Sequence, residues 1–130
     1  MAVQNKQIAY PFKAAGDLST KQFYFVKLSA AHTVDVCSGA TDKPIGVLQN
    51  KPSAAGQEAE VCVIGWTKVS SNGSVSAGDL IGTSADGQGD TKAAGTDTTE
   101  YICGQAITAG TTAGDVFEAI IDCASIGRGA

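Results

Sequence analysis

The sequence predicts an all-β protein, a small antiparallel β-barrel or sandwich, and three observations lead to this prediction. Val and Ile together number 19, against 5 for Leu and Met. β-Branched side chains pack well on a pleated sheet but lose rotamer freedom in a helix. Short apolar stretches alternate with clusters of turn residues along the chain, and no stretch shows the apolar period of a long helix. This combination is typical of an antiparallel barrel or sandwich.

The first expected element is an extended N-terminal arm over residues 1–16, followed by a single β-rich domain over residues 17–130. The arm shows no amphipathic period, and Pro11 keeps Tyr10 out of helical geometry. Lys6 and Lys13 give residues 1–13 a positive charge with no acid among them. The arm is therefore expected either to lie across the acidic surface of a neighbouring subunit or to extend into solvent, as chain termini commonly do.

Seven strands are expected in the domain, separated by turn residues. Their ranges are 21–28, 33–37, 44–50, 58–69, 79–84, 101–108 and 115–122. Gly46 predicts a bulge or a close approach of two backbones, and Gly65 is expected to interrupt the pleat of the longest strand. Asn72 and Gly73 predict a tight hairpin. In the last strand one face is expected to carry Phe117, Ala119 and Ile121, opposite Glu118 and Asp122.

The strand over residues 21–28 is apolar on both faces, with Phe23 and Phe25 on one side. Such a strand is either central in a sheet or part of an interface between subunits. The residues expected to contact a partner are therefore taken from this strand and from the arm. They are Lys6, Tyr10, Phe12, Lys13, Phe23 and Phe25.

A short turn motif recurs before several expected strands. Ala-Gly-Asp stands at residues 15–17, 77–79 and 113–115, with a looser copy at residues 55–57. Glycine can adopt a positive φ in a tight turn, and the aspartate can accept hydrogen bonds from nearby backbone N–H groups. The irregular spacing excludes a solenoid, so the motif predicts repeated turn chemistry.

The sequence holds few groups that suit catalysis. His32 is the single histidine, so any mechanism built on a histidine base depends on it, and its polar context predicts an exposed turn residue. The four cysteines are far apart in sequence and lie in apolar contexts, which predicts buried free thiols and no structural zinc site. No phosphate-binding glycine motif is present, and residues 86–90 lack the ligands of a calcium loop. We expect no enzyme activity, cofactor or metal.

The charge and composition of the chain indicate which classes of partner to expect. The net charge is −4, with +1 in residues 1–65 and −5 in residues 66–130. Binding to nucleic acid needs clustered Lys and Arg, so a nucleic-acid partner is not expected. No apolar run reaches the ~20 residues that a membrane helix needs, so no membrane partner is expected either. Large apolar residues number only 32 of 130, which favours burial against another protein.

The order of several short motifs resembles a known family. They lie at residues 44–48, 55–61, 65–69, 75–81, 86–88, 104–107 and 113–121. Over residues 17–121 this order is similar to that of the small capsid decoration (cement) proteins of tailed bacteriophages. Residues 1–16 and the four cysteines lie outside the matched pattern.

The resemblance implies a barrel-like fold, often described as a β-tulip, and assembly as a homotrimer. It implies a structural virion protein that is made in the host cytoplasm. Such a protein binds the major capsid protein on the outer surface of the phage head and strengthens the shell without catalytic residues. Two alternatives stay open. One is a trimeric β-domain of a head fibre or tail spike that binds a receptor or glycan, and the other is an enzyme that pairs a cysteine nucleophile with His32.

Overall fold

A computed structural model, in which residues 7–129 are described, confirms the all-β prediction. Within these residues every regular element is a strand. The strands are β1 (Gln7–Ala14), β2 (Phe25–Ala30), β3 (Thr33–Val36), β4 (Gly46–Leu48), β5 (Glu58–Ser70), β6 (Leu80–Thr83), β7 (Gly89–Thr91), β8 (Tyr101–Ile102), β9 (Gly104–Ala106), β10 (Val116–Asp122) and β11 (Gly127–Arg128). They form a nine-stranded sheet and a separate pair of β8 and β11.

Five strands close a ring on one side of the molecule. The order runs β1, β3, β2, β4 and β5, and β5 pairs back to β1. The pairing of β1 with β3 is parallel, so the sheet is mixed and the expectation of a purely antiparallel sheet is corrected. Gly46 of β4 sits so close to β5 that an added Cβ would lie 2.2 Å from the Cys62 carbonyl oxygen. The predicted close backbone approach at Gly46 is therefore confirmed.

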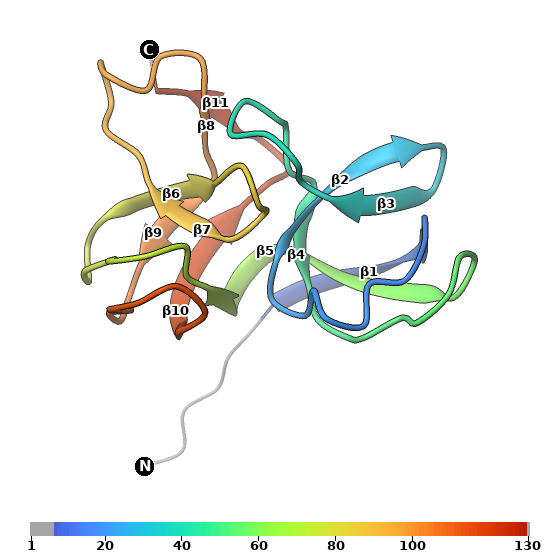
Figure 1. Cartoon of the computed structure of the whole chain (residues 1–130). Coiled ribbons are helices and arrows are strands. Elements are labelled where there is room, and N and C mark those ends of the chain that lie inside the picture. The colour runs from blue at the N-terminus through green and yellow to red at the C-terminus, as the bar shows by residue number, and fades with distance from the viewer. Residues whose placement is uncertain (1–6, 130) are drawn as a thin grey trace.

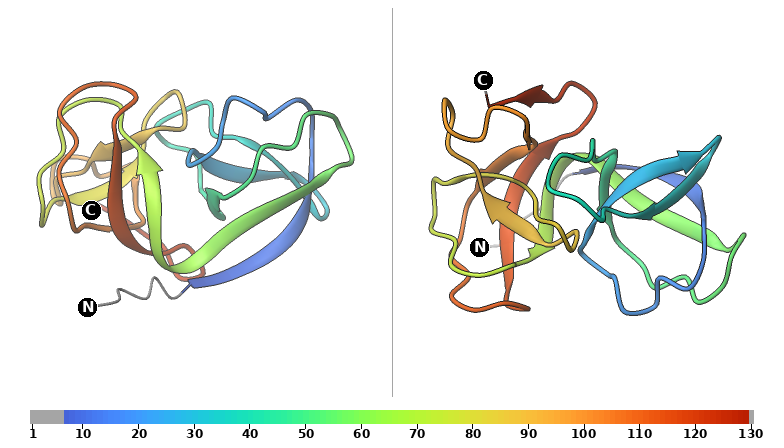
Figure 2. Two further views of the ribbon diagram at one scale, coloured as in Figure 1. Left: turned by 90° about the horizontal axis from the view of Figure 1, so that it is seen from below. Right: turned by 45° about the horizontal axis from the view of Figure 1, so that its top comes forward.

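Strand β5 is long enough to belong to two lobes (Figure 1). Its first half lies in the ring, and its second half pairs with β10, which is followed across the sheet by β9, β6 and β7. Gly65 lies between the halves with a φ of 128°, a conformation that L side chains rarely adopt. Figure 2 shows β5 bending as it passes from one lobe to the other.

Two hydrophobic clusters form the core. The cluster of the ring contains Val26, Val34, Leu48 and Val61, all fully buried. The larger cluster fills the second lobe and its junction with the ring, and it includes residues of the ring strands β2, β4 and β5. Its members are Phe25, Cys37, Val47, Cys62, Val63, Val69, Val75, Ile81, Cys103, Ala106, Phe117, Ala119, Ile121 and Cys123. The buried face expected for the last strand is thereby confirmed.

The expected N-terminal arm is largely a strand of the sheet. Residues 7–14 form β1, which runs antiparallel to β5 from Gln7 opposite Gly65 to Lys13 opposite Glu58. Its N–H and C=O groups find partners in this chain, so for these residues the structure corrects the idea of a separate arm. Lys6 lies outside the described residues.

Two local predictions differ from the structure. The strand expected over residues 21–28 begins only at Phe25, because Phe23 has a φ of 69° and stands in a turn. Asn72 and Gly73 do not form a hairpin between neighbouring strands, because β5 and β6 are not paired with each other. Instead the Ser71 hydroxyl accepts the Gly73 N–H at 3.0 Å in a local turn.

The recurring turn motif shows the expected glycine conformation at residues 77–79 and 113–115, but Gly16 of the copy at residues 15–17 does not have a positive φ. Gly78 and Gly114 both have a φ of 93°. Asp79 accepts the Ser76 N–H at 2.9 Å, and Asp115 accepts the N–H groups of both preceding threonines at 3.0 Å. These backbone hydrogen bonds lower the pKa of Asp115 to about 2, because they favour the charged carboxylate.

Candidate functional site

The outer face of the sheet carries a set of neighbouring apolar side chains, here called the apolar strip, which Gln105 interrupts between Ile120 and Leu80. It consists of Ile8 of β1, Ile120 of β10 and Leu80 of β6, which are exposed, and of Ile64 and Trp66 of β5, which are half-buried. Ile64 also packs against the larger cluster. Residues directly opposite on paired strands share a face. Ile8 lies opposite Ile64, and Trp66 lies opposite Ile120. Ile8 is 47% exposed and Ile120 is 52% exposed. Apolar side chains scattered singly on a surface are ordinary, but a contiguous set indicates an interaction site.

Two polar features lie beside the apolar strip, the Gln105 side chain and the hydrogen bond between Trp66 and Glu118. Gln105 of β9 lies between Ile120 and Leu80, opposite each of them in the ladder. The Trp66 indole N–H donates to a Glu118 carboxylate oxygen at 3.0 Å. The indole nitrogen is therefore satisfied within the chain, and a partner would meet apolar side chains with the carboxylates of Glu118 and Asp122 beside Ile120.

Three of the residues expected to bind a partner lie together on β1. Tyr10 is 52% exposed, whereas Phe12 is half-buried and packs against the cluster of the ring. Lys13 is exposed and lines a shallow hollow of about 410 Å³ with Phe12, His32 and Glu58. Tyr10 and Lys13 are thus available to a partner, while Phe12 is mainly a packing residue.

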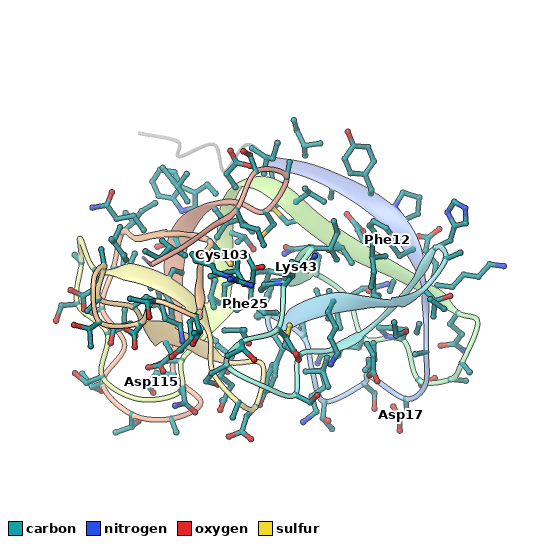
Figure 3. All side chains as sticks on the ribbon, turned by 90° about the horizontal axis from the view of Figure 1, so that it is seen from above. Phe12, Asp17, Phe25, Lys43, Cys103 and Asp115 are labelled. Carbon is teal, nitrogen blue, oxygen red and sulfur yellow. The ribbon has the colours of Figure 1, made fainter. Side chains whose placement is uncertain are left out.

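The other two expected residues lie elsewhere. Phe25 is fully buried in the larger cluster, and its N–H donates to the Gly87 carbonyl oxygen at 2.7 Å. Figure 3 shows Phe25 where the two lobes meet and Phe12 in the ring. Phe23 is half-buried against the same cluster as Phe25. The structure corrects the assignment of Phe25 to a partner surface, because a side chain buried in its own core cannot reach another chain.

Sequence reasoning overlooked the members of the apolar strip. One signal was available in β10, where Ile120 falls on the same face as Glu118 and Asp122, opposite the buried residues. A single exposed isoleucine is ordinary, so this signal gains meaning only with the apolar side chains that the fold brings beside it. Ile8 offered no such signal, because the pairing of β1 with β5 could not be derived from local spacing.

His32 lies on the surface, whereas the four cysteine thiols lie in the core, so the histidine is not beside a thiol. His32 has a φ of 57° in the turn before β3 and is exposed. All four cysteines are buried in the larger cluster. Burial raises the pKa of Cys37 to about 12 and that of Cys62 to about 11. No group of three or more metal-ligating side chains is found among residues 7–129.

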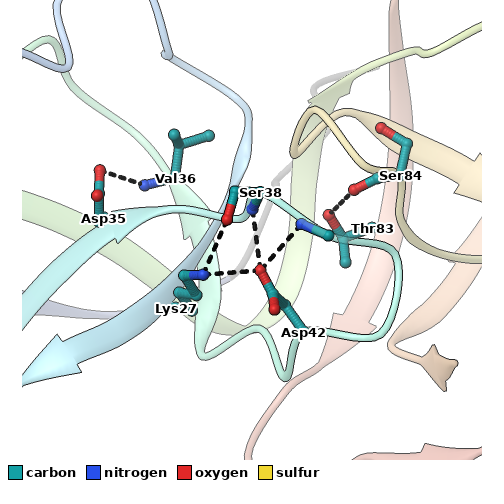
Figure 4. Close-up of polar contacts among 8 residues, drawn as sticks. Lys27, Asp35, Val36, Ser38, Asp42, Thr83 and Ser84 are labelled. Atoms are coloured by element: carbon teal, nitrogen blue, oxygen red, sulfur yellow. Dashed lines mark hydrogen bonds and ion pairs between the residues drawn. The ribbon is translucent and has the colours of Figure 1, made fainter. Parts of the chain in front are cut away.

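Ion pairs fix two of the connecting loops. Asp42 accepts the Lys27 ammonium at 2.8 Å and the N–H groups of Ser38 and Gly39 (Figure 4). The hydrogen bond from Lys27 lowers the pKa of Asp42 and raises that of Lys27. Lys92, whose side chain is 1% exposed, pairs with Glu100. These pairs hold loops in place and do not converge on a cleft.

Residues 7–129 contain no helix that is long and apolar enough to cross a membrane.

Comparison with known proteins gives one informative result. No protein-family model matches the sequence, and no curated protein matches it. The structure is similar to the N base of head fibre gp8.5 of bacteriophage phi29, with a TM-score of 0.63. The two share the fold. The sequences are 13% identical, and the alignment covers 91% of this chain and 96% of the phage chain.

Proposed function

We propose that this protein is a structural component of a bacteriophage virion that binds the outer surface of the head. The observation that carries the proposal is the likeness to the head fibre base, which extends over 91% of the chain. A fold can host unrelated functions, so the proposal also needs a surface suited to it. The apolar strip supplies such a surface.

In the proposed assembly the chain is a homotrimer, and each subunit covers the apolar strip of a neighbour. A second copy of the chain is the occupant that best fits the strip, because the apolar core within one chain is small for 130 residues. The trimer then acts as a decoration protein on the major capsid protein, leaving nucleic acid and membranes without a role. A trimer can contact several capsid subunits at once, so modest individual contacts give strong retention.

Such binding would strengthen the shell by mass action. A protein that binds the mature shell and not its dissociated subunits stabilises the shell by its binding free energy, multiplied over many sites. This mechanism requires a rigid body and a complementary surface and no chemical reaction. The function proposed here is therefore non-enzymatic.

Two measurements test the proposal. Light scattering during size-exclusion chromatography should give a mass of about 39 kDa, three times the 13.1 kDa of one chain. Incubation with phage heads that lack surface proteins, followed by sedimentation and imaging, should show the protein on the outside of the heads. A monomer at high concentration that also stays in the supernatant would refute the proposal.

A second candidate is favoured by the same structural likeness, since the similar chain is the base of a head fibre. In that role the domain would anchor a fibre on the head, and binding of a receptor or glycan would lie with the fibre. Imaging distinguishes the two roles. A compact density on the head supports decoration, whereas a projection that ends in bound glycan supports a fibre base.

A further inference from the structure

Cys103 and Cys123 are brought together by an irregularity in the sheet. Cys103 lies between β8 and β9 and belongs to neither strand. Its N–H donates to the Ile81 carbonyl oxygen at 2.8 Å, while its own carbonyl oxygen accepts the Asp122 N–H at 2.8 Å. In a regular strand both groups of one residue face the same neighbour, but here they face β6 and β10 on opposite sides. The backbone turns at this point, so Cys103 is 2% exposed although Asp122 beside it is exposed.

Cys123 follows directly after β10 and faces the same core. Its N–H donates to the Val63 carbonyl oxygen at 2.8 Å, and it is 5% exposed. The side-chain hydrogen bond with Cys103, together with burial, raises the pKa of the Cys123 thiol. The backbone agrees with this placement, because Cys123 directly follows Asp122, whose N–H donates to the Cys103 carbonyl oxygen, and both cysteines lie in the larger cluster.

The other two cysteines have different partners. The Cys62 thiol donates to the Ile64 carbonyl oxygen at 3.6 Å. Cys37 forms a side-chain hydrogen bond with Thr83. Adjacent strands lie about 4.8 Å apart, and a disulfide spans Cα separations of about 4.4–6.8 Å. The Asp122 N–H donates to the Cys103 carbonyl oxygen, so Cys123, the next residue, lies about one strand spacing across and one residue along from Cys103. That offset is close to the range that a disulfide spans.

We propose that Cys103 and Cys123 form an intrachain disulfide when the protein meets a small disulfide oxidant such as oxidised glutathione. The bond would join β9 to the end of β10 and close a loop over residues 103–123. Thiols stay reduced in a cytoplasm and oxidise outside it. The two thiols would thus form a stabilising disulfide bond after the protein leaves a reducing environment. This inference depends on the fold alone and not on the proposed role in the virion.

The structure indicates where the oxidant enters. Cys123 lines a hollow of about 460 Å³ together with Lys43, whose positive charge suits a carboxylate of glutathione, and with Lys27, which is already paired with Asp42. The Cys123 thiolate attacks one sulfur of the oxidant and expels a glutathione thiolate. Cys103 then loses its proton and attacks the Cys123 sulfur, which releases the second glutathione. Two protein thiols lose two protons and two electrons, and one oxidised glutathione becomes two reduced molecules.

The reaction is expected to be slow, because the raised pKa leaves little thiolate at neutral pH. Once formed, the disulfide should raise the thermal midpoint by about 8–15 °C, the shift that closure of a loop of this length gives in a domain of this size.

Thiol counting tests the inference on the full chain. The protein is incubated folded with oxidised glutathione, quenched with acid, unfolded and alkylated with iodoacetamide. Intact mass should show a fall from four alkylated thiols to two. Cleavage after Glu100 and Glu118 separates Cys103 from Cys123. A linked pair of peptides, 101–118 with 119–130, should then appear and should vanish on reduction.

Variants decide which thiols react. A chain with Cys37→Ala and Cys62→Ala should fall from two alkylated thiols to none, and Cys103→Ser should lose both the linked peptides and the gain in thermal midpoint. If the double variant does not fold, the peptide map of the unmodified sequence still gives the answer. Four thiols after prolonged oxidation, a link that involves Cys37 or Cys62, or a link between chains would overturn the inference.

Discussion

Ile120 and Ile121 are neighbours on β10, but their side chains lie on opposite faces of the sheet. Ile120 is 52% exposed in the apolar strip, whereas Ile121 is 1% exposed in the larger cluster. Replacing each with Ala removes the same atoms, so the two variants form a matched pair. Ile121→Ala should cost about 2–5 kcal/mol of the free energy of unfolding of the single chain. Ile120→Ala should leave that free energy almost unchanged but weaken association between copies.

The expected loss for Ile120→Ala follows from its exposure. The substitution deletes three carbon groups, worth about 0.8 kcal/mol each on full burial. Because 52% of the side chain is still exposed in one chain, about 1.2 kcal/mol per subunit is available to an interface. Three equivalent contacts in a trimer give about 3.6 kcal/mol, or roughly a 400-fold weaker association constant.

Light scattering over a dilution series measures that constant, and urea denaturation measures the stability of the single chain. Ile121→Ala is the control for a general loss of stability. If Ile120→Ala associates and binds heads as the unchanged protein does, the apolar strip is not the contact between subunits. If Ile120→Ala instead unfolds as easily as Ile121→Ala, the assignment of the two faces of β10 is wrong.

Three further predictions concern the fold. Gly46→Ala should lower the free energy of unfolding, measured by urea denaturation, by about 3 kcal/mol, because the added Cβ would lie 2.2 Å from a backbone oxygen. Gly16→Ala is the control and should have little effect, because the space around Gly16 is open. Glu100→Gln should cost about 3 kcal/mol, because it leaves the buried Lys92 ammonium without its closest partner, and a melting curve unchanged by this substitution would contradict the buried pair. The lowered pKa of Asp115 makes its carboxylate stabilising above its unfolded pKa, so that stability is lost as the pH falls from about 3.8 to about 2. Asp115→Asn should therefore flatten the fall in urea midpoint over that range, and parallel curves for the two proteins would show that the carboxylate has no such role.

Local patterns predicted what depends on local geometry. The alternation in β10 identified Phe117, Ala119 and Ile121 as the buried face, because side chains on a strand alternate with a period of two. The turn motif identified Gly78 and Gly114, because the required φ is a property of a few consecutive residues.

Pairing between distant segments could not be predicted in this way. β1 joins the sheet through β5, which lies about fifty residues further along the chain, and nothing in residues 7–14 specifies that register. The same limit explains the error at Phe25. An apolar residue on a two-faced strand fits a core or an interface equally well, and only the contact with the loop at Gly87 places it inside.

The course of β5 explains why the apolar strip is left uncovered. Both lobes curl to the same side of the surface formed by β1, β5 and β10, as Figure 2 shows. Their clusters therefore cover the inner face of these strands, and no other strand of the described chain lies over the outer face. A sheet that divides its residues between two lobes on one side must rely on another molecule to bury apolar groups on the other. Because Ile8 and Ile120 belong to different lobes, a subunit bound there would also hold the two lobes in a fixed relation across the bend at Gly65.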